Sequence, residues 1–282
     1  MPPARATLRK IRKHTAILGK RLTAPRQRAE MRARDSRLLD AVLDATAAVA
    51  ARDYTAADRE ALAAVAAYRE RLAYDPTEIS YAVFGGDASR RVSEIVARAS
   101  SPPAWGELLY LLAKFTAPRA VFELGTNLGV SGAYLLHALA ATGKPFHFTT
   151  LEGIAQLCER SAAHFATIVD PSRFTVVPGL YEDTFAPTLA AADRYDLLFI
   201  DGDHRGEPTV GYFEALKPHL RDQSLLLFDD IYNNPGMTRA WERIRSDERV
   251  TYSVDLYKLG IVVVDDNERP QQGHYGLHLS YA

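Results

Sequence analysis

Acidic residues stand at the ends of short apolar runs in the second half of the chain: Glu123, Glu152, Asp201, Asp229 and Asp230. Burial of a carboxylate without a partner costs free energy, so acidic residues in such positions indicate a binding or catalytic role. If the runs are parallel strands, their carboxyl ends lie at one edge of the sheet, where ligands of such sheets bind. The sequence therefore predicts one polar site built from these five side chains.

The segment Arg119–Ser131 has the composition of a ligand-binding turn. Val121–Leu124 is an apolar run with strand character, and from Val130 the apolar spacing becomes helical. Between them lie Gly125 and Gly129, and glycine permits a positive φ or the close approach of a ligand. A strand, a Gly-rich loop and a helix start, in this order, direct backbone N–H groups towards negative ligand groups. A plain tight turn is the alternative.

The motif acidic-x-Gly-x-x-x-Gly, with a hydroxyl residue soon after it, is present as Glu123, Gly125, Gly129 and Ser131. In these residues the chain resembles the Rossmann-like (class I) S-adenosylmethionine-dependent methyltransferases, over about residues 105–265. The dehydrogenase fingerprint does not fit, because Asn127 stands where its second glycine is required. The resemblance implies that the cofactor contacts Glu123, Gly125, Thr126, Asn127, Gly129, Ser131, Glu152, Gly179, Leu180 and Asp201.

Glu152 comes 29 residues after Glu123, one strand–helix–strand unit further along the chain. An ionised carboxylate only accepts hydrogen bonds, so it can hold both hydroxyls of a ribose. The resemblance assigns Glu152 this role and puts the adenine ring beside Gly179 and Leu180. A helix N-cap at Glu152 is the alternative.

Asp201, Asp229 and Asp230 are expected close together at the ends of two neighbouring strands. Like charges raise one another's pKa, and Mg²⁺ relieves such repulsion by binding oxygen ligands. Here the sequence resembles the metal-dependent O-methyltransferases of the catechol and caffeoyl-coenzyme A type, whose metal ligands are an Asp after the fourth strand and an Asp-Asn pair after the fifth. Asp230 replaces that Asn. In the alternative there is no metal: Asp229 or Asp230 caps a helix, and one carboxylate is protonated.

His204 lies three residues after Asp201, where the catechol-type enzymes carry a lysine thought to act as a base. A histidine titrates near neutrality and can take a hydroxyl proton, so His204 and Asp201 are the predicted catalytic residues. A supporting or solvent-facing histidine is the alternative. Asp201–His204 does not match the Asn/Asp-Pro-Pro-aromatic motif of the branch that methylates nucleic-acid amines.

Strands and helices alternate after residue 104, which predicts a parallel sheet covered on both faces. The chain closes with a tight hairpin around Lys258, whose two strands must be antiparallel. We therefore predict an α/β fold: a Rossmann-like methyltransferase sheet of seven strands, the last one antiparallel, with an N-terminal helical extension. Strands are expected at 121–124, 146–151, 173–177, 195–200, 224–228, 250–255 and 261–264. Helices are expected at 36–52, 55–73, 88–99, 104–115, 130–141, 156–169, 181–192, 206–220 and 238–245.

The charge distribution divides the chain. Residues 1–37 carry a net charge of +10 and the remainder −11, so the first segment is predicted to be a basic, mobile arm. Residues 38–104 are predicted to form a helical cap or dimerisation region, 105–265 the S-adenosylmethionine-binding domain, and 266–282 a C-terminal tail. The arm would also suit an organellar transit peptide.

Composition favours a globular protein of a reducing compartment. With 282 residues, 47% of them hydrophobic, the chain can bury a large core, and no apolar run approaches the ~18 residues of a membrane span. Cys158 is the only cysteine, which excludes an internal disulfide and favours the cytoplasm. We expect a homo-oligomer without a membrane partner.

These observations together predict an S-adenosylmethionine-dependent O-methyltransferase that acts, with Mg²⁺ assistance, on a small hydroxylated molecule. Two alternatives stay open: an RNA ribose methyltransferase, and a non-catalytic S-adenosylmethionine-binding protein with an RNA-docking arm. Nucleic acid is not expected as a partner, because no aromatic residues are interleaved with the arginines of the arm.

Overall fold

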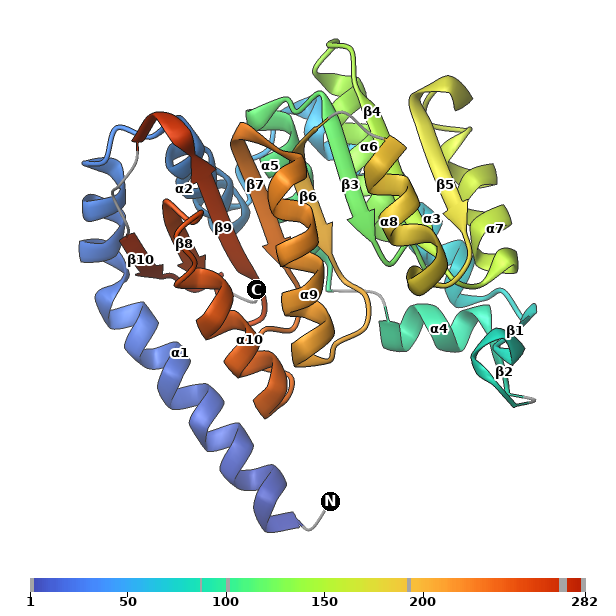
Figure 1. Cartoon of the computed structure of the whole chain (residues 1–282), viewed down its shortest axis with the longest axis horizontal. Coiled ribbons are helices and arrows are strands. Elements are labelled where there is room, and N and C mark those ends of the chain that lie inside the picture. Colours follow the sequence, from blue (N-terminus) through green and yellow to red (C-terminus); the bar gives the residue numbers. More distant parts are fainter. Residues whose placement is uncertain (1–2, 87, 100–101, 192–193, 269–272, 280–282) are drawn as a thin grey trace.

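The computed structural model describes residues 3–86, 88–99, 102–191, 194–268 and 273–279. Its centre is an eight-stranded sheet with the order β10-β8-β9-β7-β6-β3-β4-β5 (Figure 1). Strands β3 to β7 are parallel, β9 is antiparallel to β7 and to β8, and β10 is parallel to β8. The strands are β3 (Ala120–Leu124), β4 (His147–Glu152), β5 (Phe174–Pro178), β6 (Tyr195–Ile200), β7 (Leu220–Phe228), β8 (Tyr252–Asp255), β9 (Gly260–Asp265) and β10 (Gly273–Gly276).

Helices cover both faces of this sheet, so it has a hydrophobic core on each side (Figure 1). Helices α2, α5, α6 and α7 pack on one face, and α8, α9 and α10 on the other. The predicted α/β fold with its seven-stranded Rossmann-like sheet, β3 to β9, is confirmed. The helices are α1 (Pro3–Arg32), α2 (Arg37–Ala51), α3 (Ala56–Ala73), α4 (Val92–Ala99), α5 (Pro103–Thr116), α6 (Val130–Ala141), α7 (Ala155–Phe165), α8 (Tyr181–Ala191), α9 (Gly206–Leu216) and α10 (Pro235–Arg245).

Local sequence explains the elements that hold the site. Strand β3 pairs with β4 on one side and β6 on the other, and its last four residues are buried. A parallel strand in this position has no solvent face, which is why its run is apolar apart from Glu123. Helix α6 begins directly after Gly129, whose φ of +74° suits glycine. Helix α3 begins with a capping box formed by Thr55 and Asp58.

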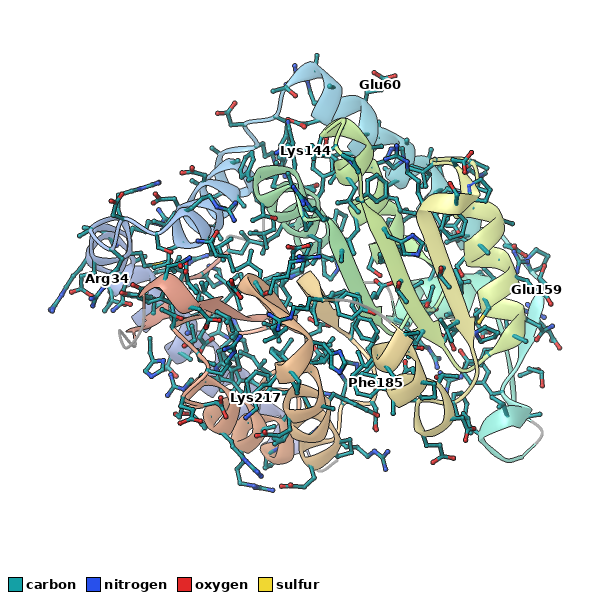
Figure 2. The ribbon with its side chains drawn as sticks, turned by 45° about the horizontal axis from the view of Figure 1, so that its top comes forward. Arg34, Glu60, Lys144, Glu159, Phe185 and Lys217 are labelled. Carbon is teal, nitrogen blue, oxygen red and sulfur yellow. The ribbon has the colours of Figure 1, made fainter. Side chains whose placement is uncertain are left out.

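Residues 1–37 were predicted to be a basic, mobile arm, and the structure describes most of this segment as one helix. Residues 3–32 form the long helix α1, and Met31 near its end is fully buried. Lys20 forms an ion pair with Asp255 at 2.9 Å, and Arg34 (labelled in Figure 2) donates to the hydroxyl of Tyr275 at 2.9 Å. The segment is therefore tied to β8 and β10, and its high positive charge did not predict these contacts.

The segment 266–282, predicted as a C-terminal tail, contributes strand β10, which pairs with β8; residues 269–272 and 280–282 lie outside the described part. The helix expected at 88–99 starts only at Val92, because Ser89–Arg91 forms strand β2, which pairs with β1 (Glu78–Ser80). Among the described helices, none is both long and apolar enough to cross a bilayer.

Candidate active site

A cavity of about 610 Å³ opens where the carboxyl ends of β3, β6 and β7 meet the N-terminal helices. The structure brings most of the predicted site residues to its wall, whereas Glu123, Gly129 and Gly179 do not line it. Leu180 lines an adjoining cavity of about 940 Å³, which shares Glu152 and Tyr181 with the first. The predicted residues that line the first cavity are Gly125, Thr126, Asn127, Ser131, Glu152, Asp201, His204, Asp229 and Asp230.

The loop after β3 passes close to the end of β6. Gly125 has a φ of +106°, and a Cβ atom there would lie 2.6 Å from the carbonyl oxygen of Asp201. Only glycine can therefore keep the backbone of this loop so close to β6. Asn127 follows with a φ of +50°, a conformation that asparagine tolerates better than most residues.

Glu152 links this loop to the next one. Its Oε2 accepts from the backbone N–H of Asn127 at 2.8 Å and its Oε1 from that of Ile154 at 2.9 Å. Burial raises the pKa of Glu152 above its ordinary value, and these backbone hydrogen bonds oppose the rise. A carboxylate oxygen can accept more than one hydrogen bond, so Glu152 is oriented towards the cavity and still able to accept from a ligand.

Glu123 lies beneath the cavity floor and is fully buried. Its Oε2 accepts from the hydroxyl of Thr150 at 2.7 Å, and Thr150 also contacts Thr126 at 2.5 Å. Burial raises the pKa of Glu123 to about 7. The hydroxyls of Ser131 and Thr150 oppose this rise, so the carboxyl of Glu123 is tied to the start of α6 and to β4.

Lys258 lies among the three acidic residues that were expected to bind a metal. Its Nζ is 2.7 Å and 2.5 Å from the two carboxylate oxygens of Asp229, and 3.1 Å from Oδ1 of Asp230. Burial lowers the pKa of Lys258, but the negative charges of Asp229 and Asp230 raise it more, so the pKa lies above its ordinary value. Burial and the charge of Asp229 raise the pKa of Asp201 well above its usual range.

This geometry does not fit the expected Mg²⁺ site. In the described residues, no group of three or more His, Cys, Asp and Glu side chains has an arrangement that could hold a metal ion. The positive charge beside Asp229 comes from Lys258, and the raised pKa of Asp201 agrees with the alternative of one protonated carboxylate. Mg²⁺ binding therefore stays a prediction without support from the side-chain geometry.

His204 lines the same cavity beside Asp201. Its Nε2 lies 3.6 Å from Oδ1 of Asp201, which is longer than a hydrogen bond. The backbone carbonyl of His204 accepts from the side chain of Asn234, which also caps the N-terminus of α10. The loop is thus held through its backbone while the ring of His204 faces the cavity.

The opposite wall comes from the N-terminal helices, and sequence reasoning did not identify its residues. The hydroxyl of Tyr68 on α3 donates to the carbonyl of Leu128 at 2.7 Å, so α3 is anchored to the glycine loop. Helical periodicity predicted these helices but could not reveal which of their side chains face a cavity. The missed lining residues include Arg69, Tyr81, Phe84, Arg98, Tyr134, Tyr181 and Lys258.

The comparison with known families decides what kind of domain holds this cavity. Residues 122–231 match a family described as a methyltransferase domain. The matched segment is similar to methyltransferase domains. Its boundaries include the glycine loop, Glu152, His204 and the pair Asp229 and Asp230. The resemblance to Rossmann-like methyltransferases is thereby confirmed.

Relatives and solved structures agree with this assignment. A Mycobacterium leprae protein, provisionally named an O-methyltransferase, is 37% identical over 122 residues, which are 43% of this chain and 52% of that protein. The chain thus spans about half the length of this curated relative. The O-methyltransferase from Bacillus cereus in complex with SAH has a similar fold, with a TM-score of 0.50, 20% identity, and coverage of 75% of this chain and 91% of that one. Cofactor-bound Rv0187 from MTB also has a similar fold, with a TM-score of 0.53 and 21% identity; the match covers 73% of this chain and 90% of that one.

Proposed function

We propose that this protein is an S-adenosylmethionine-dependent O-methyltransferase that acts on a small hydroxylated molecule. One observation carries the proposal: a single cavity is lined by the glycine loop and Glu152 at one part and by Asp201 and His204 at another. A methyl donor and an acceptor bound there would be neighbours, and such positioning is a large part of the catalysis of group transfer.

The cofactor-binding part consists of the loop after β3 and the carboxylate of Glu152. Gly125, Thr126 and Asn127 bring the loop to the cavity wall, and the carboxylate of Glu152, held by the N–H of Asn127, supports binding of ribose hydroxyls. Leu180 and Tyr181 provide apolar surface beside Glu152, in the adjoining cavity, for a flat base.

The acceptor part consists of Asp201 and His204. Bound S-adenosylmethionine supplies a methyl group on a positively charged sulfur, so a lone pair of the acceptor oxygen forms the new O–C bond while the electron pair of the C–S bond stays on sulfur. His204 takes the proton of the hydroxyl at Nε2. Oδ1 of Asp201 lies 3.6 Å from this nitrogen, so Asp201 borders the place where the acceptor hydroxyl would lie. The helices that form the opposite wall exclude water from this step.

The proposal is tested by incubating the full chain with labelled S-adenosylmethionine and a panel of catechols, sugars, polyketides and RNA oligonucleotides, each with and without Mg²⁺. We expect O-methylation of a small hydroxylated acceptor, detected by mass spectrometry, and a loss of about 100-fold or more in kcat for His204→Ala. Methylation of RNA alone would favour the ribose methyltransferase. Cofactor binding without transfer to any acceptor would favour the non-catalytic alternative.

Mg²⁺ assistance is kept as a prediction outside this mechanism. No step above uses a metal ion, because Lys258 contacts the oxygens that were expected to bind it. The identity of the acceptor follows from the panel and not from the sequence.

A further inference from the structure

We propose that the ammonium group of Lys258 takes the place of a divalent cation in this cavity, so that the acceptor oxygen is bound and activated without a metal ion. This inference rests on the proposed O-methyl transfer. It concerns a residue on the turn between β8 and β9, 28 residues beyond the nearest acidic residue of the site.

The first support is the position of the Lys258 ammonium. Its Nζ lies within 2.7 Å of both oxygens of Asp229 and 3.1 Å from Asp230. Mg²⁺ requires its oxygen ligands at about 2.0–2.1 Å. An ion bound to the same oxygens would lie against the ammonium, and two positive charges in contact repel strongly. Mg²⁺ and the ammonium group of Lys258 therefore cannot both bind the oxygens of Asp229 and Asp230.

The second support is the fixation of the turn that carries Lys258. The carbonyl of Lys258 accepts from the N–H of Ile231 at 3.2 Å, so its backbone is bonded to the residue after Asp230. The N–H of Tyr257 donates to Asp255 at 2.7 Å, and Asp255 is paired with Lys20 of α1 at 2.9 Å. Lys258 is thus held in the cavity wall by its backbone and by its side chain.

The third support is the charge of the cluster. Asp201, Asp229 and Asp230 bring three carboxyl groups to one cavity, and Lys258 offsets part of their negative charge. Without the lysine, these groups would favour a hard divalent cation. With it, Asp229 already has a charged hydrogen-bond partner for each of its oxygens.

The chemical role follows from the fixed positive charge of the ammonium group. Lys258 stays protonated throughout, with its three N–H groups directed at Asp229 and Asp230, and its charge stabilises the negative charge that develops on the acceptor oxygen while the hydroxyl proton passes to His204. The lone pair of that oxygen forms the O–C bond, the C–S bond breaks, and the sulfur becomes neutral. A fixed positive charge placed beside a developing negative charge is among the strongest contributions to catalysis.

Metal binding gives a test that needs no turnover. Mn²⁺ is titrated into the full chain and its free signal is followed by electron paramagnetic resonance. We expect no binding tighter than about 1 mM to the wild type, and at least about 10-fold tighter binding to the double variant Lys258→Met/Asp230→Asn, which keeps two carboxyl groups and an amide oxygen without the ammonium. Micromolar binding to the wild type that Asp229→Asn abolishes would overturn the proposal. So would a folded double variant that gains no affinity.

The rate of methyl transfer gives the second test. Wild-type turnover of an acceptor found in the panel should be unchanged by excess chelator, Lys258→Met should lose about 100-fold in kcat, and Lys258→Arg should recover part of the loss. The matched control is Lys217→Met, because Lys217 (labelled in Figure 2) also bridges two carboxylates, Glu214 at 2.6 Å and Asp247 at 3.0 Å, and does not line the cavity. The control should keep the wild-type rate.

The outcomes separate this inference from the proposed function. If the wild type methylates no acceptor, the proposed function fails, and the Mn²⁺ titration still decides which cation occupies the place. If it methylates an acceptor but chelator abolishes turnover, the function stands and the role of Lys258 is refuted. A Lys258→Met variant with the wild-type kcat would also refute it.

Discussion

The two parts of the cavity hold their carboxylates in different ways. Glu152, in the cofactor part, is oriented by backbone N–H groups of Asn127 and Ile154, which belong to the loops on either side of it. Asp229, in the acceptor part, is held by the side chain of Lys258 from a distant hairpin. Backbone donors are present whatever the residue type, whereas a side-chain cation depends on one residue. The cofactor part is therefore the more constrained in geometry and the acceptor part the more dependent on charge.

Gly125→Ala should give the largest effect, because it disrupts the geometry of the cofactor part. The added Cβ would lie 2.6 Å from the Asp201 carbonyl oxygen, in addition to the strain of a φ of +106°. Gly143→Ala is the matched control, since its φ is +65° with no atom within 4 Å of the new Cβ. We expect the control to lose only about 1 kcal/mol of unfolding free energy and Gly125→Ala about 3 kcal/mol or more, with loss of cofactor binding. Equal losses in thermal melts would contradict the close approach.

Glu123→Gln should change the pH dependence of stability in the cofactor-free protein. The folded pKa of about 7 exceeds the ordinary value of 4.5, so the folded state binds the proton more strongly and wild-type stability falls as pH rises between these values. The glutamine of the variant cannot ionise. Between pH 5 and pH 8 the free energy of unfolding of the variant should therefore fall by up to about 3 kcal/mol less than that of the wild type. Denaturant unfolding at both pH values measures this. The exposed Glu159→Gln, on α7, is the control, and identical profiles for Glu123→Gln and wild type would argue against a buried titrating carboxyl.

Glu152→Ala tests the cofactor part by affinity. Loss of charge-assisted hydrogen bonds to a ribose should weaken S-adenosylmethionine binding by about 1.5–3 kcal/mol, or roughly 10- to 150-fold. Isothermal calorimetry provides the measurement, and the exposed Glu60→Ala on α3 should bind as the wild type does. Unaltered affinity in Glu152→Ala would remove this residue from the cofactor site.

Lys20→Ala should have the smallest effect and should act on the acceptor part alone. Its ion pair with Asp255 supports the turn that carries Lys258, and it is distant in the fold from the glycine loop. We expect kcat to fall about 2- to 5-fold, in line with the loss of a partly exposed ion pair, with an unchanged cofactor Kd. The exposed neighbour Arg21→Ala should change neither quantity. A weakened cofactor Kd in Lys20→Ala would show that the two parts are coupled more closely than their contacts indicate.

The predicted helix and strand bounds agree with the structure where an element is specified by residues close together in the sequence. Helix α6 spans the predicted Val130–Ala141, and β3 differs from its expected bounds by one residue, because apolar periodicity and glycine positions are local features. The same features did not predict α1 or β10, whose stability depends on contacts with distant segments such as the pair of Lys20 and Asp255. Charge density and missing periodicity describe a segment alone and say nothing of the surface that it meets.

The fold class and the glycine loop could be predicted from the sequence alone. So could the position of Glu152, Asp201, Asp229 and Asp230 at one edge of the sheet, because the carboxyl ends of parallel strands lie at the same edge. Only the tertiary structure decided which cation contacts those acids. Lys258 is in a turn whose sequence has no chemical motif, and its ammonium comes within reach of Asp229 only when β9 pairs with β7. A through-space charge contact between residues far apart in the chain leaves no spacing pattern by which it could be predicted.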